Sequence, residues 1–577
     1  MKPYLLFDEE TAKMLEGTGA SGSLRSSESL LRSSGSGRDY GVLAGAAGGW
    51  GNRTPAMQAV RNAYGLRPSE KTANVPAPGE EGDLSRDLNL SVVFEAMAGK
   101  DAFLHEVAQQ VVPATVFDEN VIRFRQEILT DVLHYPRTIR SLYGLASDAV
   151  EESLLYRNQN QPNYAQVVTM GEKVQKALGL MERLLNRTEM LAKLLVSSGG
   201  TCRSRGLAAF RARVDTMLSD AFLEHANRHV EELRSLAEGG RLVLGSALGL
   251  GLKGSGHVLR GILDPSEFSV FGKLSGMSFS RESKATIRLD NIALSRSADE
   301  LQDAAFVHVL RVIGRLSDEL FRFFEILRFE TGFYAGCLNL YETLMSLGVP
   351  LCLPEIPTDT RPGMQFEQLV DVGLALSNRQ CPVSNSLSAP EGRLFVVTGA
   401  NQGGKSTYLR SIGLAQLFLQ CGLFVTAKQF GAPLRDAVFT HFARPEDTGM
   451  EHGRLEEELA RMDGIVKRMT GNSMLLLNES FATTTERAGA RIALELVPPL
   501  QAYGVEILYV THMYEFANGI RSLEIPGTIF LRAERAPDGQ RSFRVEKGEP
   551  LPTSYGVDLF EKWVGEPRPA QQGESDG

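Results

Sequence analysis

The sequence predicts a fold in two parts, in which a mainly α-helical region precedes an α/β domain with a mostly parallel sheet. Between residues 85 and 240, apolar residues recur three and four positions apart, which is the spacing of helices with one buried face. After Pro350, short apolar strands alternate with helices, as they do in parallel sheets. A glycine-rich loop directly follows one of these strands.

The size and composition of the chain indicate a soluble protein with more than one domain. Its 577 residues exceed one ordinary core, and 43% of them are hydrophobic and 23% charged. A formal net charge of -9 excludes a uniformly basic coat for nucleic acid, but a local basic stripe is enough to contact phosphates. The N-terminus lacks the apolar segment of a signal peptide, and the stretch from Leu242 to Leu252 is too short to span a bilayer. We therefore expect a cytoplasmic protein with no membrane contact.

The two ends of the chain are expected to contribute little to a core. Residues 17–56 are dominated by Gly, Ser and Ala, and Pro, Gly and Glu continue to about residue 84. Such segments bury little apolar surface. The sequence therefore predicts a flexible Gly/Ser-rich arm over residues 1–84 and a polar tail over residues 566–577.

A helical domain is predicted over residues 85–335. Its periodic pattern breaks between residues 240 and 290, where glycine is frequent and the segment KATIRLDNIAL alternates like a strand. We expect a small β-containing excursion there. Helical periodicity resumes at about residue 297 and continues to Gly348, a length that suits either two packed helices or one long lever.

An α/β domain is predicted over residues 336–565. Each short apolar run in it is followed by a segment with helical spacing, which favours a parallel sheet. The expected elements are strands over 394–398, 473–478 and 506–511 and helices over about 405–421 and 486–502.

The glycine-rich loop carries the strongest functional signal. Its sequence GANQGGKS matches the phosphate-binding pattern G-x-x-x-x-G-K-S/T between a strand and a helix. Backbone N–H groups of such a loop converge on phosphate oxygens, and the positive end of the next helix points at the same anion. We expect Lys405 to reach the β- and γ-phosphates of ATP and Ser406 to bind Mg²⁺. The predicted ATP contacts are Gly399, Ala400, Asn401, Gln402, Gly403, Gly404, Lys405, Ser406 and Thr407. The domain is therefore predicted to be a P-loop NTPase.

A second signal is the apolar strand SMLLLN, which ends in a polar pair. In such strands the first carboxylate usually holds the Mg²⁺ shell, and the second polarises the attacking water. Here the pair is Asn478 and Glu479. Glu479 is the expected general base or water-orienting carboxylate. Ser406, Asn478 and Glu479 form the predicted metal site, in which Asn478 accepts a hydrogen bond from a metal-bound water or from Ser406 without adding negative charge.

A third signal is His512, which follows the strand EILYVT. A lone histidine at a strand end is more often structural. In register with the loop and the carboxylate, His512 is expected to hydrogen-bond the γ-phosphate. The predicted catalytic residues are therefore Lys405, Glu479 and His512.

Together these segments resemble the ATPase domain of the MutS family, whose P-loop fold is of the MutS/ABC type. Asn401 in the loop and Asn385, which leads a strand upstream, are features of that family. The likeness covers about residues 340–565, and a weaker likeness in helical pattern to the family's core and lever helices covers about residues 85–335. The segments that carry it are TGANQGGKST, FVTAKQFGAPLRDAVFTHFARPED, LLLNESFATTTERAG and YVTHMYEFA.

The resemblance implies a homodimer with two composite ATP sites, in which a signature segment of one subunit completes the site of the other. The matching stretch here is GMEHGRLEEELARM. The serine of the family's segment falls on Gly453, while Glu458 occupies the place of the family's glutamate. Arg454 is then a candidate source of positive charge. The other interpretation of Glu456 to Glu458 is a solvated helix face supported by pairs four residues apart, such as Arg454–Glu458 and Glu457–Arg461.

Three departures from the family lie at the predicted hydrolytic site. Asn478 replaces an acidic residue, Gly453 lacks the serine hydroxyl, and Phe481 and Ala482 replace a Gly-Arg pair. These changes favour ATP binding with slow hydrolysis.

DNA is the expected macromolecular partner, with structure-selective or non-specific binding. The family reads mismatches with a Phe-x-Glu wedge in a separate N-terminal domain. The triplets that begin at Phe7 and Phe117 do not lie in a domain of that kind. Phosphate contacts are expected from basic residues of the helical region, although a solvated face is the commoner role for any one of them. The candidates are Arg123, Arg125, Arg137, Arg140, Arg203, Arg205, Arg211 and Arg213.

The leading functional prediction is a Mg²⁺-dependent, dimeric ATPase that couples its nucleotide state to clamping on DNA in repair or recombination. The alternative is a nucleotide-switched protein-interaction module with weak hydrolysis and no direct DNA role, which Asn478 and Gly453 motivate. A third class, the SMC- or ABC-type ATPases, fits less well because the loop contains Asn401 and the chain has no LSGGQ-like sequence.

Overall fold

A computed structural model describes most of the chain between residues 82 and 550. The described residues are 5, 82–114, 116–159, 169–198, 203–237, 241–248, 254–263, 292–357, 363–399, 403–444, 453–535 and 541–550. Most of the predicted arm over 1–84 and the whole predicted tail over 566–577 lie outside them. Contacts divide the chain into two compact units. Among the described residues, the helical unit comprises Leu5 and 134–332, and the sheet unit comprises 82–133 and 333–550.

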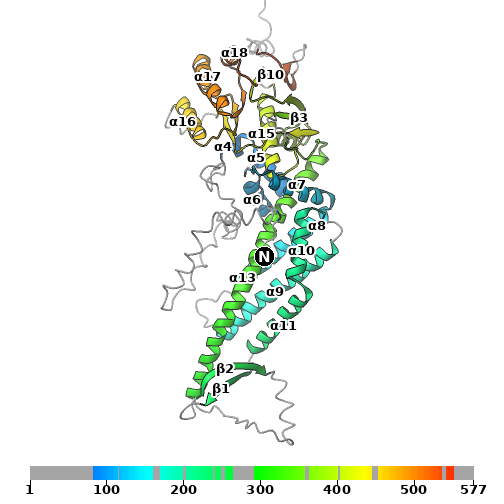
Figure 1. The fold of residues 1–577 in the computed structure, drawn as a ribbon, viewed down its shortest axis with the longest axis vertical. Coiled ribbons are helices and arrows are strands. Elements are labelled where there is room, and N and C mark those ends of the chain that lie inside the picture. The colour runs from blue at the N-terminus through cyan, green and yellow to red at the C-terminus, as the bar shows by residue number, and fades with distance from the viewer. Residues whose placement is uncertain are drawn as a thin grey trace, which may run out of the picture. The chain divides into compact units, whose positions relative to one another are not determined.

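The helical unit is built from long amphipathic helices (Figure 1). Its helices are α8 (Pro136–Gln159), α9 (Met170–Ser197), α10 (Arg205–Met217), α11 (Asp220–Ala237) and the first part of α13 (Ile292–Ser346). Apolar side chains at helical spacing on three of them form one core. Its buried members are Val174, Leu178, Met181 and Leu185 of α9, Val230 of α11, and Phe306 and Ile313 of α13.

The β-containing excursion predicted between residues 240 and 290 is confirmed, although its described strands are not in the segment KATIRLDNIAL. Strands β1 (Arg241–Leu248) and β2 (Gly254–Leu263) form an antiparallel hairpin. Most of the segment KATIRLDNIAL lies outside the described residues, and its last residues, 292–294, already belong to α13. That helix runs unbroken over 55 residues. The long periodic segment is therefore one helix and not two.

The sheet unit begins with helices that the sequence assigned to the helical domain, apart from residues 83 and 84, which it assigned to the arm. These are α4 (Asp83–Asp87), α5 (Leu90–Ala98), α6 (Ala102–Val111) and α7 (Glu119–His134). On α7, Arg125 is buried and donates to the carbonyl of Cys421 at 3.3 Å. Asn339, near the end of α13, donates to the carbonyl of Met97 at 2.9 Å. Helical periodicity reveals that a face is buried but not which partner buries it, so this grouping differs from the predicted domain limits.

A mixed, mostly parallel sheet forms the centre of this unit. Six described strands have the order β11-β10-β5-β9-β8-β7, in which β10 and β11 pair antiparallel and the other neighbours pair parallel. Their bounds are β5 (Leu394–Thr398), β7 (Val438–Phe442), β8 (Met474–Asn478), β9 (Glu506–Val510), β10 (Thr528–Arg535) and β11 (Arg541–Lys547). The predicted strands match β5, β8 and β9, and the others were not predicted.

Helices cover the main sheet on both faces, which explains why its central strands are apolar throughout. Leu475 and Leu477 of β8 face a core shared with helices α16 (Arg454–Val466), α17 (Glu486–Tyr503) and α18 (Tyr514–Ser522). Leu476, between them, lies against Gly413 of α15 (Lys405–Cys421) on the opposite face. Figure 1 shows α15 and α16–α17 on opposite sides of the sheet. The predicted helices over 405–421 and 486–502 are thus confirmed.

A small sheet, of order β4-β3-β6, lies next to α15. It contains β3 (Met364–Leu369), β4 (Asn385–Ala389) and β6 (Gln429–Gly431), and α14 (Val372–Asn378) follows β3. Stacked rings of Phe366 and Phe430, with centroids 6.2 Å apart, hold β3 on β6. This sheet supplies one wall of the candidate site.

Among the described residues, no helix combines the length and the apolar character needed to cross a membrane.

A buried ion pair lies at the end of the main sheet opposite to the glycine-rich loop. Arg435, which precedes β7, pairs with Glu506 at the start of β9, and their side chains are 1% and 0% exposed. Asn472 also accepts a hydrogen bond from Arg435 at 3.2 Å. Each charge is costly to bury without the other.

We expect Arg435→Met to lower the free energy of unfolding of the sheet unit by about 3–5 kcal/mol, because the Glu506 carboxylate stays buried without its partner. Hydrogen exchange of β8 and β9 in increasing urea measures this change. The matched control is the double variant Arg435→Met/Glu506→Met, which removes both charges and should recover most of the loss. A double variant as unstable as the single one would contradict this explanation.

Candidate nucleotide-binding site

The glycine-rich loop connects β5 to α15 as its sequence predicts. Gly399 and Gly404 have φ values of 117° and 87°, which residues with a Cβ atom rarely adopt. A Cβ atom on Gly399 would lie 3.0 Å from the backbone nitrogen of Ala533. Gly404 is the N-cap of α15 and offers no side-chain cap to the first turn, so the helix presents its N–H groups to an anion. The predicted contacts Ala400, Asn401 and Gln402 lie outside the described residues.

Lys405 is buried at the start of α15, with 5% of its side chain exposed. Its ammonium donates to the carbonyl of Gly399 at 2.7 Å and lies 3.9 Å from Glu479 Oε1. Burial lowers the pKa of Lys405, and the carboxylate of Glu479 opposes that shift. A phosphate anion at this position would stabilise the charged form further.

Two of the three residues of the predicted metal site, Ser406 and Asn478, are in contact. Asn478 is the last residue of β8, and its Oδ1 accepts a hydrogen bond from Ser406 Oγ at 2.9 Å. The sequence predicted this bond as one of two options for Asn478. The hydroxyl and the amide oxygen are hard donors of the kind that Mg²⁺ prefers, and Glu479 is the next residue along the chain. These donors fit a magnesium ion that keeps several water ligands.

Glu479 and His512 meet at the ends of neighbouring parallel strands. Glu479 follows β8, and His512 lies two residues after β9. Oε2 of Glu479 lies 2.5 Å from His512 Nδ1 and 3.2 Å from the backbone nitrogen of the same residue. The hydrogen bond from the imidazole to Glu479 raises the pKa of His512, although partial burial opposes this shift. The structure therefore brings Lys405, Glu479 and His512 into one cluster.

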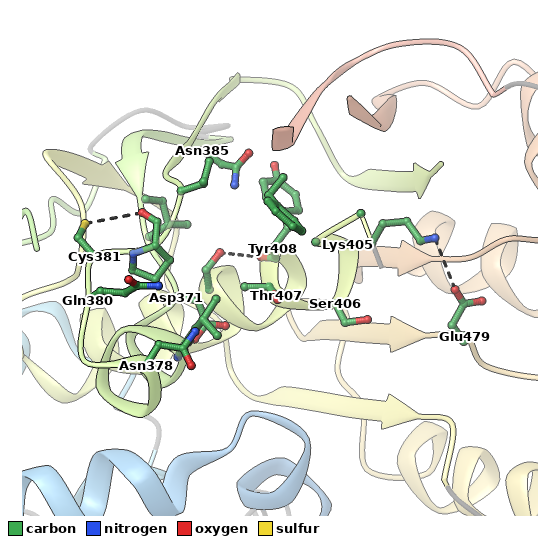
Figure 2. Close-up of a pocket in the computed structure, with 18 residues that line it drawn as sticks. Asp371, Asn378, Gln380, Cys381, Asn385, Lys405, Ser406, Thr407, Tyr408 and Glu479 are labelled. Carbon is green, nitrogen blue, oxygen red and sulfur yellow. Dashed lines mark hydrogen bonds and ion pairs between the residues drawn. The ribbon is translucent and has the colours of Figure 1, made fainter. Parts of the chain in front are cut away.

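A cavity of about 710 Å³ opens beside this cluster. Figure 2 shows Lys405, Ser406 and Glu479 on one side of it and Asn378, Gln380 and Cys381 on the other. The remaining lining residues are Leu369, Asp371, Leu374, Pro382, Val383, Asn385, Gly403, Gly404, Thr407, Tyr408, Ser411 and Phe543. Such a volume suits a small organic ligand that reaches from the loop toward α14.

Sequence reasoning missed most of the far wall of this cavity. Asp371 is buried and caps α14 by accepting from the Leu374 nitrogen at 2.8 Å, and burial raises its pKa. Tyr408 is 2% exposed, and its hydroxyl has no hydrogen-bond partner among the described residues. The N-cap pattern at Asp371 was readable in the sequence. No local pattern brings Phe543 of β11 to this cavity.

Asn385 leads a strand, as its resemblance to the family implies. It is the first residue of β4, and its Oδ1 accepts from the backbone nitrogen of Val545 at 2.8 Å. This bond joins the small sheet to β11 at the cavity wall.

The signature stretch forms α16 behind Gly453, which is an N-cap without a side-chain hydrogen bond. Residues 445–452 lie outside the described part of the chain. The alternative interpretation as a solvated face is wrong for Glu458, which is 5% exposed and accepts a hydrogen bond from Thr483 at 2.9 Å. Arg461 is also turned inward and donates to the carbonyl of Phe442 at 2.9 Å. The polar sequence of α16 did not show that Glu458 and Arg461 face the protein interior.

One candidate for phosphate contact is excluded by burial. Arg125 is 1% exposed and donates to the Cys421 carbonyl, so it does not face DNA. Arg123 is half-exposed and pairs with Glu119 at 2.6 Å. Arg211 lies 3.7 Å from Asp215 on the same helix.

Two family models match the chain. The MutS2 N-terminal domain matches residues 117–347, and MutS domain V matches residues 395–568. Together they cover more than half of the sequence.

The curated proteins that match the chain also carry the name MutS. The DNA mismatch repair protein MutS of Haloquadratum walsbyi is 30% identical over 196 residues, which are 32% of this chain and 21% of that protein. The protein of the same name from Thermotoga neapolitana is 32% identical over 169 residues, 29% of this chain and 21% of that protein. The one from Streptococcus pneumoniae is 25% identical over 288 residues, 48% of this chain and 32% of that protein. The matches thus span about a fifth to a third of these relatives.

We expect the pKa of His512 to lie above its ordinary value in the wild-type protein and to fall in Glu479→Gln, because the variant removes the carboxylate that stabilises the imidazolium. The stability that this contact contributes is present below the pKa of the unfolded state and is lost as the pH rises through the folded pKa. An NMR titration of the 9 histidines measures the shift. An unchanged pKa in Glu479→Gln would disprove the contact.

Proposed function

The chain belongs to the MutS family, and we propose on that basis that it is an ATP-binding, Mg²⁺-dependent ATPase that acts on DNA. MutS-family proteins are ATPases, and the relatives named above are mismatch repair proteins by name. The observation that carries the proposal is the single cluster formed by Lys405, Ser406, Asn478, Glu479 and His512, of which Lys405, Ser406 and Glu479 line the cavity. The process that we propose is DNA repair or recombination.

In this proposal the loop binds the triphosphate of ATP. Backbone N–H groups at Gly403 and Gly404 and the positive end of α15 face the phosphates. Lys405 sits 3.9 Å from Glu479 Oε1, close enough to contact a γ-phosphate that Glu479 also faces. Ser406, Asn478 and, through water, Glu479 would hold Mg²⁺, which neutralises phosphate charge when bound.

Glu479 would orient the water that attacks the γ-phosphorus. The water oxygen forms the new bond to phosphorus, the bond to the bridging oxygen of ADP breaks, and the proton of the water passes to Glu479 or to solvent. His512 holds the Glu479 carboxylate at 2.5 Å through Nδ1. The raised pKa of His512 favours its imidazolium form, which would place positive charge near the phosphate.

We infer slow hydrolysis from the charge of the site. Asn478 replaces a carboxylate with a neutral amide, so the metal is held with one negative charge less. Gly453 supplies no hydroxyl at the N-terminus of α16. The same two residues motivate the second candidate function, a nucleotide-switched interaction module with weak hydrolysis and no direct DNA role.

The proposed assembly is a homodimer in which α16 of one subunit faces the ATP site of the other. Gly453, Arg454 and Glu456 at the start of α16 are exposed, as a surface that contacts a partner must be before assembly. The N-terminus of a helix also favours an anion such as a γ-phosphate. The helical unit would then carry the change of nucleotide state to DNA.

We expect Lys405→Ala to abolish ATP binding while the fold stays intact, because the variant removes the ammonium that is buried beside the loop. Titration of a fluorescent ATP analogue measures binding, and circular dichroism checks the fold. Lys428→Ala is the matched control, since that exposed lysine pairs with Glu367 away from the cavity. Unchanged ATP affinity in Lys405→Ala would show that the loop does not bind the nucleotide.

We expect Glu479→Gln to keep ATP binding and to reduce steady-state hydrolysis at least about tenfold, because the amide polarises water poorly. A phosphate-release assay measures hydrolysis. Tight ATP binding together with a turnover that Glu479→Gln leaves unchanged would favour the interaction module over the ATPase.

We expect binding to duplex, branched or mismatched DNA to weaken as salt rises and to respond to ATP, because phosphate contacts release counterions. A salt titration with fluorescence anisotropy on the three substrates measures both effects. If none of them binds in a salt-dependent way with or without ATP, the role on DNA is wrong and the interaction module is favoured.

A further inference from the structure

The loop that carries Glu479 has an unfavourable backbone conformation. Glu479 and Phe481 have φ values of 53° and 63°. Residues with a Cβ atom avoid this left-handed region, and a bulky one such as phenylalanine is a clear outlier there. Each such residue is strained and persists only where the surroundings hold it. The position of the Glu479 carboxylate therefore depends on what holds residues 479–481.

Ser480 is the most firmly held residue of this loop. It is fully buried, and its Oγ lies 2.8 Å from His441 Nδ1 and 2.7 Å from the His441 carbonyl oxygen. Its own carbonyl accepts a hydrogen bond from the hydroxyl of Tyr509 at 2.6 Å. The ring of His441 also lies 5.6 Å from the ring of Phe481. His441 thus touches two successive residues that follow Glu479.

His441 connects this loop to α16 in either neutral tautomer. Burial and the nearby guanidinium of Arg461 lower the pKa of His441 to about 4, so the ring is neutral near pH 7. With the proton on Nδ1, the ring donates to Ser480 Oγ, and Nε2 accepts from Arg461 Nη2 at 3.3 Å. With the proton on Nε2, the ring donates to the carbonyl of Glu458 at 3.1 Å, and Ser480 must turn its hydroxyl proton from the His441 carbonyl to Nδ1. Both partners of Nε2 belong to α16.

Further contacts hold the α16 side of this connection. Arg461 donates to the carbonyl of Phe442 at 2.9 Å and lies 3.9 Å from the carboxylate of Asp83 on α4. Thr483 donates to Glu458 Oε2 at 2.9 Å. The side chain of His441 therefore contacts Glu458 and Arg461 of α16 on one side and Ser480 of the strained loop on the other, and other contacts hold these partners in place.

We propose that His441 is a positioning residue for Glu479: it holds the strained loop through Ser480 and ties that loop to α16 of the same chain. This inference rests on the proposed role of Glu479 in ATP hydrolysis. His441 touches neither the cavity nor the glycine-rich loop among the described residues. Its effect therefore falls on turnover and not on ATP affinity.

The test compares His441→Ala with His441→Asn and with Phe439→Leu. His441→Ala should reduce kcat about 10- to 100-fold, because a reacting group displaced by about 1 Å loses that much rate. The Kd for ATP should change less than about threefold, since the phosphate contacts stay in place. In His441→Asn the amide nitrogen replaces Nδ1 as donor to Ser480, and kcat should return to within about threefold of the wild type.

Phe439→Leu is the control for a loss of stability alone. Phe439 lies on the same face of β7 as His441, two residues earlier, and belongs to the core that contains Leu475 and Leu477, but its phenyl ring cannot hydrogen-bond Ser480. It should lower stability and leave kcat unchanged. Ser480→Ala provides a second route if His441→Ala does not fold. The effects of His441→Ala and Ser480→Ala on kcat should be non-additive, since both break one contact.

The pKa of His512 gives a readout that does not depend on turnover. Glu479 raises this pKa by direct contact, so a displaced loop should return it toward its ordinary value in His441→Ala but not in Phe439→Leu. If wild-type protein does not hydrolyse ATP, the proposed function fails while the pKa test still decides the positioning role. An unchanged kcat together with an unchanged His512 pKa in a folded His441→Ala would overturn the inference.

Discussion

The candidate site depends on the register of three parallel strands. Val510 of β9 pairs with Val397 of β5 on one side and with Asn478 of β8 on the other. Backbone hydrogen bonds continue this row past the strand ends, from Glu479 N to the Val510 carbonyl at 2.9 Å and from Thr511 N to the Val397 carbonyl at 3.0 Å. The loop glycines, the Asn478–Glu479 pair and His512 therefore emerge at one edge. A slip of one residue would turn alternate side chains to the other face and scatter the cluster.

The parts of the site that follow this row were readable from the sequence, because each lies directly after an apolar strand. The P-loop pattern, the polar pair at Asn478 and the histidine after β9 are local signals, and the helices that follow are long and periodic. Parallel strands end at a common edge, so their polar ends are expected to meet. Sequence alone was therefore sufficient to predict which residues meet at this edge.

Other features depend on contacts between distant segments, and the sequence did not reveal them. The helices at 83–133 are amphipathic like those of the helical unit, so their association with the sheet had no local signal. Phe543 reaches the cavity only because β11 returns next to β10. Glu458 lies in a polar run, EEE, that suggested a solvated face. It is nevertheless buried and accepts a hydrogen bond from Thr483. Burial of this kind is set by tertiary packing and not by periodicity.

The contact between α4 and the main sheet affects which recombinant fragments of the protein are expected to stay soluble. Among the described strands β7 pairs with β8 alone, so its other side is an open edge of the kind that templates intermolecular β-pairing. Residues of α4 shield that edge: α4 lies against β7, and Asp83 pairs with Arg444 just beyond the strand. A recombinant fragment that starts near residue 333 would contain all the described strands of the sheet and still be prone to aggregation. A soluble sheet unit needs residues 83–88 supplied, either by circular permutation or by coexpression of the N-terminal piece.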